Sequence, residues 1–245
     1  MAKKKEKDSL KDNIKTLGIA VLIAIGFRSF LFEPFNIPSG SMIPTLLVGD
    51  YLFVSKYSYG YSRYSFPFGA VPFDDRIMAG EPERGDVVVF RLPSNVSVDY
   101  IKRVVGLPGD KIQLKQGQLY VNDTLVPRRF VGSQTVSLGY RDVEVRAFEE
   151  TMDNGKTYLI HEFGDNDQMD NTKIYEVPEG HYFMMGDNRD RSKDSRFADV
   201  GFVPFENLIG RAEFLFFSVD QSARIWEFWK WPFTIRYSRI ANGID

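Results

Sequence analysis

The sequence predicts a mainly β protein with an antiparallel core, preceded by one N-terminal transmembrane helix. A lysine-rich head leads into an apolar stretch close to the N-terminus. Beyond it, short runs of β-branched and aromatic residues alternate with turn residues, and helical periodicity is weak. Such runs are typical of antiparallel strands that are joined by tight turns.

The N-terminal segment is expected to be an uncleaved membrane anchor. Six lysines and three acidic residues occupy the first fifteen positions, and an apolar run follows from Leu17 to Phe27. Eleven residues are short for a span of about 20, but apolar residues continue beyond Arg28, whose long side chain can reach the interface. The bulky "FRSFLFEPF" lacks the small residues of a signal-peptide cleavage site. We therefore expect a basic cytoplasmic head at 1–13, an anchor at 14–32 and the remaining chain on the outer side.

Seven segments are expected to be strands because β-branched and aromatic residues dominate them. They are 51–57, 86–92, 99–105, 111–122, 158–163, 181–186 and 212–219. The segment 115–179 is more polar than its flanks, which indicates a smaller β or loop region inserted into the core. The core would then consist of two parts, 33–114 and 180–245.

Composition excludes several classes of function. The formal net charge is −2 and no long basic face is visible, so nucleic acid is not an expected partner. The chain has no cysteine, which rules out disulfides, thiolate catalysis and cysteine-bound metals. The acidic stretch "GDNDQMDN" (164–171) departs from a calcium loop because Met169 takes a ligand position and the required glycine is missing. No metal is expected.

The stretch "FNIPSGSMIPTLLVGD" (35–50) contains a candidate nucleophile, Ser41. Gly40 permits backbone angles that are closed to other residues, so Ser41 can be presented outside regular pairing. Read alone, the stretch is more simply an ordinary turn. A catalytic serine also needs a base. His161 and His181 lie in apolar strands, where a packed ring is the simpler explanation, and a lysine base is the other option.

Lys102 is the candidate lysine base, because "VDYIKRVVGLPGD" (98–110) has the pattern of a buried strand that ends in a turn. Alternation along a strand places Lys102 on the same face as Tyr100 and Val104. Lowering its pKa from about 10.4 to near 7 takes about 3 units, or roughly 4 kcal/mol, and burial can supply this. The alternative is a strand-edge lysine whose ammonium group remains in water.

A third candidate element is "MGDNRDRSKDSRF" (185–197), in which seven of thirteen residues are charged. The simpler explanation is a solvated turn rich in aspartate and asparagine. The functional explanation is that these charges pair internally and form a rigid platform for a hydroxyl group such as that of Ser192.

These stretches together resemble bacterial type I signal peptidases, the membrane-bound serine endopeptidases that remove signal peptides from exported preproteins. Four motifs match in the order of the family, behind an N-terminal anchor: "FNIPSGSMIPTLLVGD" (35–50), "RGDVVVF" (84–90), "YIKRVVGLPGD" (100–110) and "GDNRDRSKDSR" (186–196). The resemblance extends from the anchor to about Phe217. It implies an antiparallel β catalytic core with a second β region inserted between the lysine and "GDNR" motifs.

The resemblance also implies roles for individual residues. Ser41 would be the nucleophile and Lys102 its general base, while the Ser39 hydroxyl and the Ser41 backbone N–H would form the oxyanion hole. Ser192 would orient the lysine, above an ion pair of Asp194 and Arg196. Apolar residues would line small pockets for alanine-like side chains, namely Phe35, Ile37, Met42, Leu46, Tyr100 and Ile101.

The resemblance further implies a substrate and a location. Secretory preproteins would be cut after small-x-small sequences without metal, nucleotide or other cofactor. The enzyme would lie in the bacterial cytoplasmic membrane as a single-pass protein with its catalytic part outside. Two other functions fit parts of the sequence: a self-cleaving serine–lysine peptidase, which would carry a helix-turn-helix instead of an anchor, and a membrane-tethered β domain without catalytic activity.

All three tryptophans fall in "RIWEFWKWPF" (224–233), together with Arg224 and Lys230. Tryptophan beside basic residues is typical of a membrane interface. The segment is therefore expected either to enter the outer leaflet of the lipid bilayer or to pack as a C-terminal element on the core.

Overall fold

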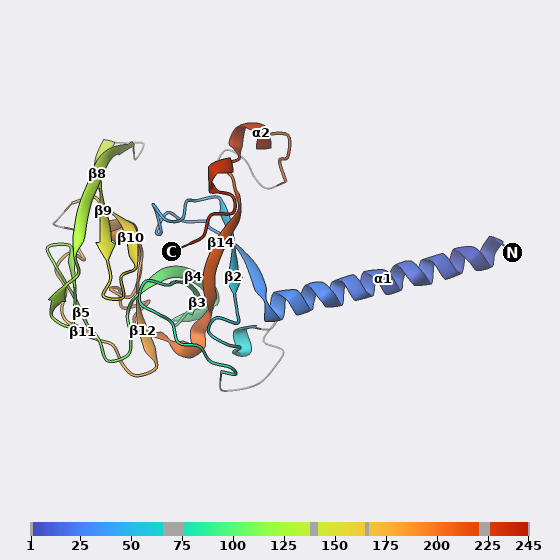
Figure 1. The fold of residues 1–245 in the computed structure, drawn as a ribbon, viewed down its shortest axis with the longest axis horizontal. Helices are drawn as coiled ribbons and strands as arrows, with labels where there is room; N and C mark the ends of the chain where they lie inside the picture. The colour runs from blue at the N-terminus through green and yellow to red at the C-terminus, as the bar shows by residue number, and fades with distance from the viewer. Residues whose placement is uncertain (1, 66–75, 138–141, 165–166, 221–225, 245) are drawn as a thin grey trace.

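The computed structural model describes residues 2–65, 76–137, 142–164, 167–220 and 226–244. A single long helix, α1 (Ala2–Phe30), projects from a body made of three antiparallel sheets (Figure 1). The mainly β fold with one N-terminal apolar helix is thereby confirmed. Residues 66–75 and the start of the tryptophan-rich segment lie outside the described residues.

Helix α1 is continuous through the predicted head and the predicted anchor. Within it, the stretch Lys11–Phe30 is long and apolar enough to cross a membrane, and only 6% of it is buried. The helix ends two residues before the expected anchor end at residue 32. Phe32 belongs instead to strand β1 (Phe32–Asn36), where it pairs with Ser55 of β2 (Asp50–Ser55).

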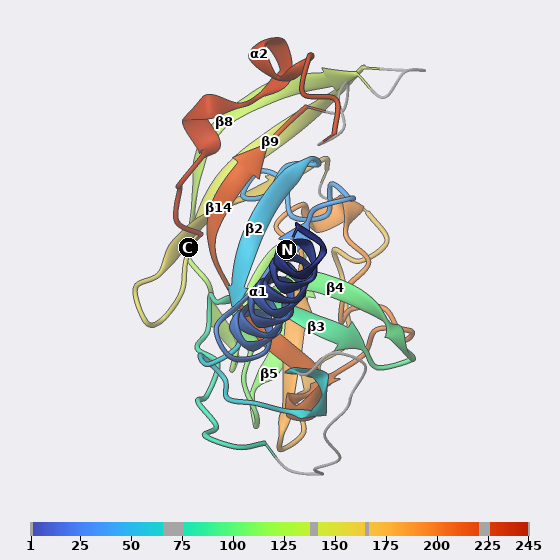
Figure 2. The same ribbon diagram turned by 90° about the vertical axis from the view of Figure 1, so that its right-hand side faces the viewer.

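The end of α1 is fastened to the body by charged and aromatic contacts. Arg28 Nε donates to Glu33 at 3.0 Å, and the buried Lys56 Nζ lies 2.8 Å from the other Glu33 oxygen. The Phe30 ring meets the Tyr61 ring edge-on at 5.6 Å, and the Tyr61 hydroxyl donates to Phe30 O at 2.8 Å. These contacts fix the direction in which α1 leaves the body, which Figure 2 shows nearly end-on.

The main sheet has seven strands in the order β1-β2-β14-β3-β4-β12-β13. The members not yet given are β3 (Val87–Leu92), β4 (Asn95–Gly106), β12 (His181–Met185), β13 (Val203–Pro204) and β14 (Leu208–Ser218). Apolar side chains cover both of its faces. Val54, Val87 and Leu215 lie in one cluster, while Val88, Phe90 and Val104 lie in another. Residues far apart in the sequence are paired in register within this sheet, such as Val54 of β2 and Ala212 of β14.

The region between β4 and β12 forms two smaller sheets. One has the order β11-β5-β6-β7 and the other the order β10-β9-β8. Their strands are β5 (Lys111–Lys115), β6 (Gln118–Val121), β7 (Thr124–Leu125), β8 (Arg128–Ser137), β9 (Asp142–Thr151), β10 (Thr157–Glu162) and β11 (Tyr175–Glu176). The expectation of one strand over 111–122 is wrong, because Gln116 and Gly117 turn the chain with positive φ values of 51° and 72°.

Strands β8 and β9, ten residues each, were not predicted from the sequence. The segment 115–179 is more polar than its flanks, which favours a loop-like interpretation. In β9, however, Val143, Val145 and Ala147 alternate with polar residues, which is the pattern of a strand with one covered face. That alternation is the signal that would have revealed the hairpin.

Candidate active site

Ser41 lies in the loop that follows β1, and only 9% of it is exposed. The loop is fixed from the "GDNR" motif: the Asn188 backbone N–H donates to Ser41 O at 3.1 Å, and Asn188 Nδ2 donates to Gly40 O at 2.9 Å. The Ser41 hydroxyl is therefore presented by a turn that a distant segment holds in place.

Lys102 projects from the middle of β4, with only 4% of its surface exposed. Its Nζ donates to Ser41 Oγ at 2.7 Å and to Ile101 O at 2.7 Å, and it lies 5.2 Å from the centre of the Tyr100 ring. The alternative of a lysine whose ammonium group remains in water is therefore wrong. Burial lowers the pKa of Lys102 to about 8, against the opposing attraction of Asp194 and Asp187. A lysine with this pKa is a partly neutral amine near neutral pH.

Ser39 is the second serine of the loop. Its Oγ lies 3.4 Å from Ser41 Oγ. A hydroxyl at this distance can turn towards an oxygen on the carbon that Ser41 attacks, as an oxyanion-hole donor must.

The ion pair expected between Asp194 and Arg196 forms in a buried position. Arg196 Nε lies 2.8 Å from Asp194 Oδ1, and Gly186 N donates to Asp194 Oδ2 at 3.0 Å. Burial alone would raise the pKa of Asp194, but the Arg196 charge and these hydrogen bonds lower it below its usual value. Asp194 therefore stays ionised next to the lysine that it attracts.

Ser192 does not make the hydrogen bond to Lys102 that the resemblance implies. Lys102 donates to Ile101 O instead, and the buried Ser192 side chain acts on Asp194, whose pKa it helps to lower. The serine packs tightly against Gly186, where an added Cβ would lie 2.2 Å from Ser192 Oγ and 2.5 Å from Ser41 O. Only glycine fits at this position between the two serines.

Three residues beneath the dyad were not singled out from the sequence. Asp187 accepts from Arg103 Nε at 2.9 Å, from the second Arg103 nitrogen at 2.8 Å and from the Thr45 hydroxyl at 2.5 Å. The contacts join the serine loop, the lysine strand and the "GDNR" motif at one carboxylate. The available signal was Arg103 itself, a charged residue between Ile101 and Val105 on the same face of its strand.

A cavity of about 670 Å³ opens at Ser41 and Lys102. One wall comes from the serine loop and β4, and the other from the inserted strands and the "GDNR" motif. Its lining includes Pro38, Ser39, Gly40, Ile43, Val98, Asp99, Tyr100, Ile101, Gln134, Val136, Val145, His161, Phe163, Asn188, Arg191 and Lys193. Burial lowers the pKa of His161 despite the nearby Asp187, so this ring is neutral at neutral pH.

The predicted pocket residues divide into two groups. Tyr100 and Ile101 line the cavity. The other four lie in, or pack against, the core cluster behind the serine loop: Ile37, Met42, Leu46 and, partly buried, Phe35. Met42 and Leu46 are fully buried, because the turn that exposes Ser41 directs them inwards.

Comparison with known proteins places this site in a family. Residues 10–217 match the family model described as signal peptidase, peptidase S26. The chain belongs to this signal peptidase family. It is 48% identical over 222 residues to signal peptidase I of Rickettsia typhi (strain ATCC VR-144 / Wilmington), which covers 87% of this chain and 83% of the relative. Signal peptidase I of Rickettsia akari (strain Hartford) is 49% identical over 206 residues, 81% of this chain and 76% of the relative.

A solved signal peptidase I from Enterococcus faecalis V583 is also similar, with 26% identity and a TM-score of 0.32 over 54% of this chain and 96% of that one. The family membership identifies this signal peptidase as a hydrolase, a serine peptidase that acts on signal peptides. Its N-terminal apolar helix fits a membrane anchor.

Proposed function

We propose that this signal peptidase cuts preproteins through a dyad of Ser41 and Lys102. The observation that carries the proposal is the 2.7 Å contact between Lys102 Nζ and Ser41 Oγ, made by a lysine that is almost completely buried. A buried amine with a lowered pKa can accept the hydroxyl proton, which an ordinary surface lysine cannot do at neutral pH.

The proposed reaction has two stages. Neutral Lys102 accepts the proton of Ser41 as Ser41 Oγ attacks the scissile carbonyl, and the Ser39 hydroxyl and Ser41 N–H stabilise the negative oxygen. Protonated Lys102 then gives its proton to the leaving amine. Neutral again, it activates the water that hydrolyses the acyl-enzyme. Asp194 and Arg196 support this arrangement from below, and Ser192 contacts the same segment through Gly186.

The substrate is proposed to bind as an extended strand along β4. Strand β4 pairs with β12 only through Arg103–Gly106, so the part from Val98 to Lys102 has a free edge that lines the cavity. A peptide added at that edge would place alternate side chains towards the serine loop. We infer that small side chains are preferred next to the cut, as in small-x-small sites, because Tyr100 and Ile101 restrict the room there.

The membrane topology is proposed from charge. Lysines at the start of α1 favour a cytoplasmic N-terminus, with the catalytic body on the outer side of the bacterial inner membrane. In the tryptophan-rich segment, Trp231 packs against Phe217 at 5.1 Å, whereas Trp226 and Trp229 are 63% and 60% exposed. We propose that the two exposed tryptophans contact the lipid bilayer.

Incubation of the detergent-solubilised protein with a labelled preprotein tests the activity and the nucleophile together. We expect one cut after a small-x-small sequence, lost in Ser41→Ala and retained in the exposed control Ser238→Ala. Cleavage by Ser41→Ala at the wild-type rate would contradict the dyad. Vesicle sedimentation with Trp226→Ala/Trp229→Ala, in a form that begins after α1, tests the lipid contact; unchanged sedimentation would disprove it.

A further inference from the structure

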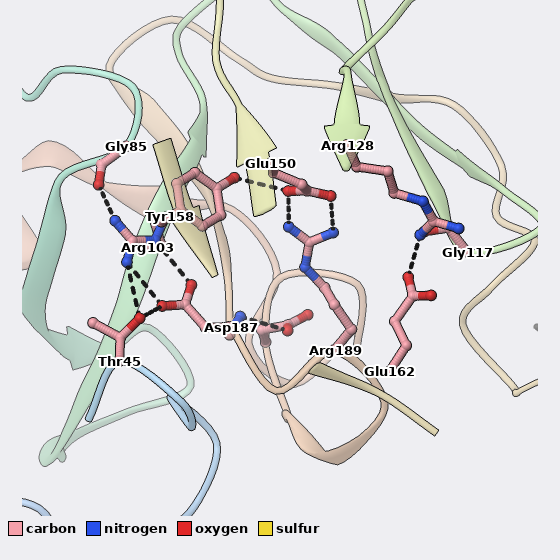
Figure 3. A network of polar contacts seen from close by, with 12 residues as sticks. Thr45, Gly85, Arg103, Gly117, Arg128, Glu150, Tyr158, Glu162, Asp187 and Arg189 are labelled. Atoms are coloured by element: carbon pink, nitrogen blue, oxygen red, sulfur yellow. Dashed lines mark hydrogen bonds and ion pairs between the residues drawn. The ribbon is translucent and has the colours of Figure 1, made fainter. Parts of the chain in front are cut away.

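A continuous set of buried polar contacts joins the dyad region to the inserted sheet (Figure 3). It begins at Asp187, which binds Arg103 and Thr45. The Arg103 guanidinium lies over the ring of Tyr158 in β10, with 4.0 Å between its central carbon and the ring centre. The residue that follows Lys102 in the main sheet is therefore in direct contact with the inserted region.

The contacts continue within the inserted sheet. The Tyr158 hydroxyl donates to Glu150 Oε2 at 2.9 Å, and Glu150 is completely buried in β9. Arg189 binds both oxygens of Glu150, one of them at 2.8 Å. Arg189 lies in the "GDNR" motif, so the path returns to the segment from which it began.

The path closes on the other side of the dyad. Arg196 donates to Arg189 O and is paired with Asp194, whose second oxygen accepts from Gly186 N. Gly186 directly precedes Asp187. The contacts therefore form a closed loop through β4, the inserted sheet and the "GDNR" motif, and Thr45 of the serine loop is attached to it at Asp187. We call these residues the buried ring: Thr45, Arg103, Glu150, Tyr158, Asp187, Arg189, Asp194 and Arg196.

We propose that Glu150 and Tyr158 are positioning residues for the Ser41–Lys102 dyad, so that the inserted sheet is part of the catalytic framework. The inference rests on the dyad proposed above. Tyr158 holds Arg103, Arg103 holds Asp187, and Asp187 holds the serine loop through Thr45. Each of these side chains lies in one defined geometry because hydrogen bonds or ring contact fix it on more than one side.

The chemistry of the ring favours positioning over simple stabilisation. Replacing a buried ion pair by apolar side chains of similar volume is often neutral or stabilising, so stability alone gives little reason to bury these charges. Directional hydrogen bonds do fix the relative positions of the strands that carry them. A shift of about 1 Å at a reacting group can cost about a hundredfold in rate.

The test is a graded series at Tyr158 and Glu150 in the full-length enzyme. Tyr158→Phe keeps the ring over Arg103 and loses only the bond to Glu150, whereas Tyr158→Leu loses both. Tyr120→Leu is the matched control, because Lys115 lies over the Tyr120 ring at 4.6 Å in the other inserted sheet. Glu150→Gln is matched by Glu162→Gln, since Glu162 is equally buried and pairs with Arg128 outside the ring.

The readouts are kcat and KM for a signal-peptide substrate, corrected for the folded fraction, and the pH profile of kcat/KM. We expect Tyr158→Leu and Glu150→Gln to lower kcat about tenfold with KM nearly unchanged, and Tyr158→Phe to fall between them and the wild type. In Tyr158→Leu, a looser Arg103 neutralises Asp187 less, so the midpoint assigned to Lys102 should rise by about half a unit.

Other charges act on the same profile. Asp194 stays ionised, the nearby Asp199 raises the pKa of Lys193 at the cavity edge, and Asp99 is paired with Arg91 at 3.0 Å. Burial raises the pKa of Glu162, which follows His161, to about 7, so Glu162→Gln also measures the contribution of this group to the profile. Burial lowers the pKa of His161, so this ring loses its proton at a lower pH than Lys102 does.

The proposal would be overturned if folded Tyr158→Leu and Glu150→Gln had the wild-type kcat and the wild-type midpoint of the pH profile, as their controls do. If Tyr158→Leu does not fold, Tyr158→Phe and Glu150→Gln decide by the same criterion for kcat. A wrong dyad proposal gives a different result, because Ser41→Ala would then remain active. If only the positioning role is wrong, Ser41→Ala is inactive and the variants of the buried ring have the wild-type kcat.

Discussion

The pH dependence of cleavage should follow the deprotonation of Lys102. With a pKa of about 8, the neutral fraction of this lysine is about a tenth at pH 7, about half at pH 8 and about nine tenths at pH 9. Only the neutral amine can accept the Ser41 proton, so kcat/KM should rise about tenfold per pH unit below 7 and level off above 9.

The assay is the initial rate of peptide cleavage in detergent from pH 6 to 10, at substrate concentrations far below KM. His161→Gln is the control, because His161 is a second titratable base that lines the cavity. Its pKa is lowered, so this variant should retain the midpoint near 8. A rate that still rises about sevenfold between pH 9 and 10, as for an unperturbed lysine of pKa about 10.4, would refute the role assigned to burial.

Three further outcomes are expected. Ser39→Ala should lower kcat by about a hundredfold with little change in KM, since it removes one oxyanion donor; equal activity in a steady-state assay would exclude Ser39 from that role. Arg196→Met should destabilise the fold by about 3–5 kcal/mol in denaturant unfolding, because it leaves Asp194 buried and unpaired. The exposed pair Arg129–Glu149 provides the control, because Arg129→Met should lower the free energy of unfolding by only about 0–1 kcal/mol. An equal loss of stability in Arg196→Met and Arg129→Met would contradict the importance assigned to burial of the Asp194–Arg196 pair. Gly186→Ala should displace Ser41 and lower kcat/KM by about a hundredfold, whereas Gly164→Ala, which has open space around it, should not.

The sequence predicted those parts of the site that depend on neighbours along the chain. Ser41 is presented by a turn whose glycine and prolines are visible in the sequence, and Lys102 lies in a strand with a regular apolar pattern. The resemblance to a known family joined the two across 61 positions, the separation that their hydrogen bond spans.

Partner choice and side-chain direction were harder to predict. Arg103, Glu150 and Asp187 are charged residues in separate segments, and only the folded sheets show that they are buried together. Met42 and Leu46 are close to Ser41 in sequence, yet the tight turn directs them into the core. The cavity wall formed by β8 and β9 was missed because charged residues on the open face of that hairpin obscured its alternation.

The fastening of α1 to the body has a geometric consequence. Glu33 bridges Arg28 on the helix and Lys56, the residue that follows β2, and Tyr61 holds the last turn of the helix. If α1 crosses a bilayer as proposed, these contacts hold the catalytic serine at a fixed height above the lipid surface, because the body cannot rotate freely about the end of the helix. The enzyme would then select the peptide bond that lies at that height above the membrane. A signal peptide with a longer or shorter apolar run would present a different peptide bond to Ser41.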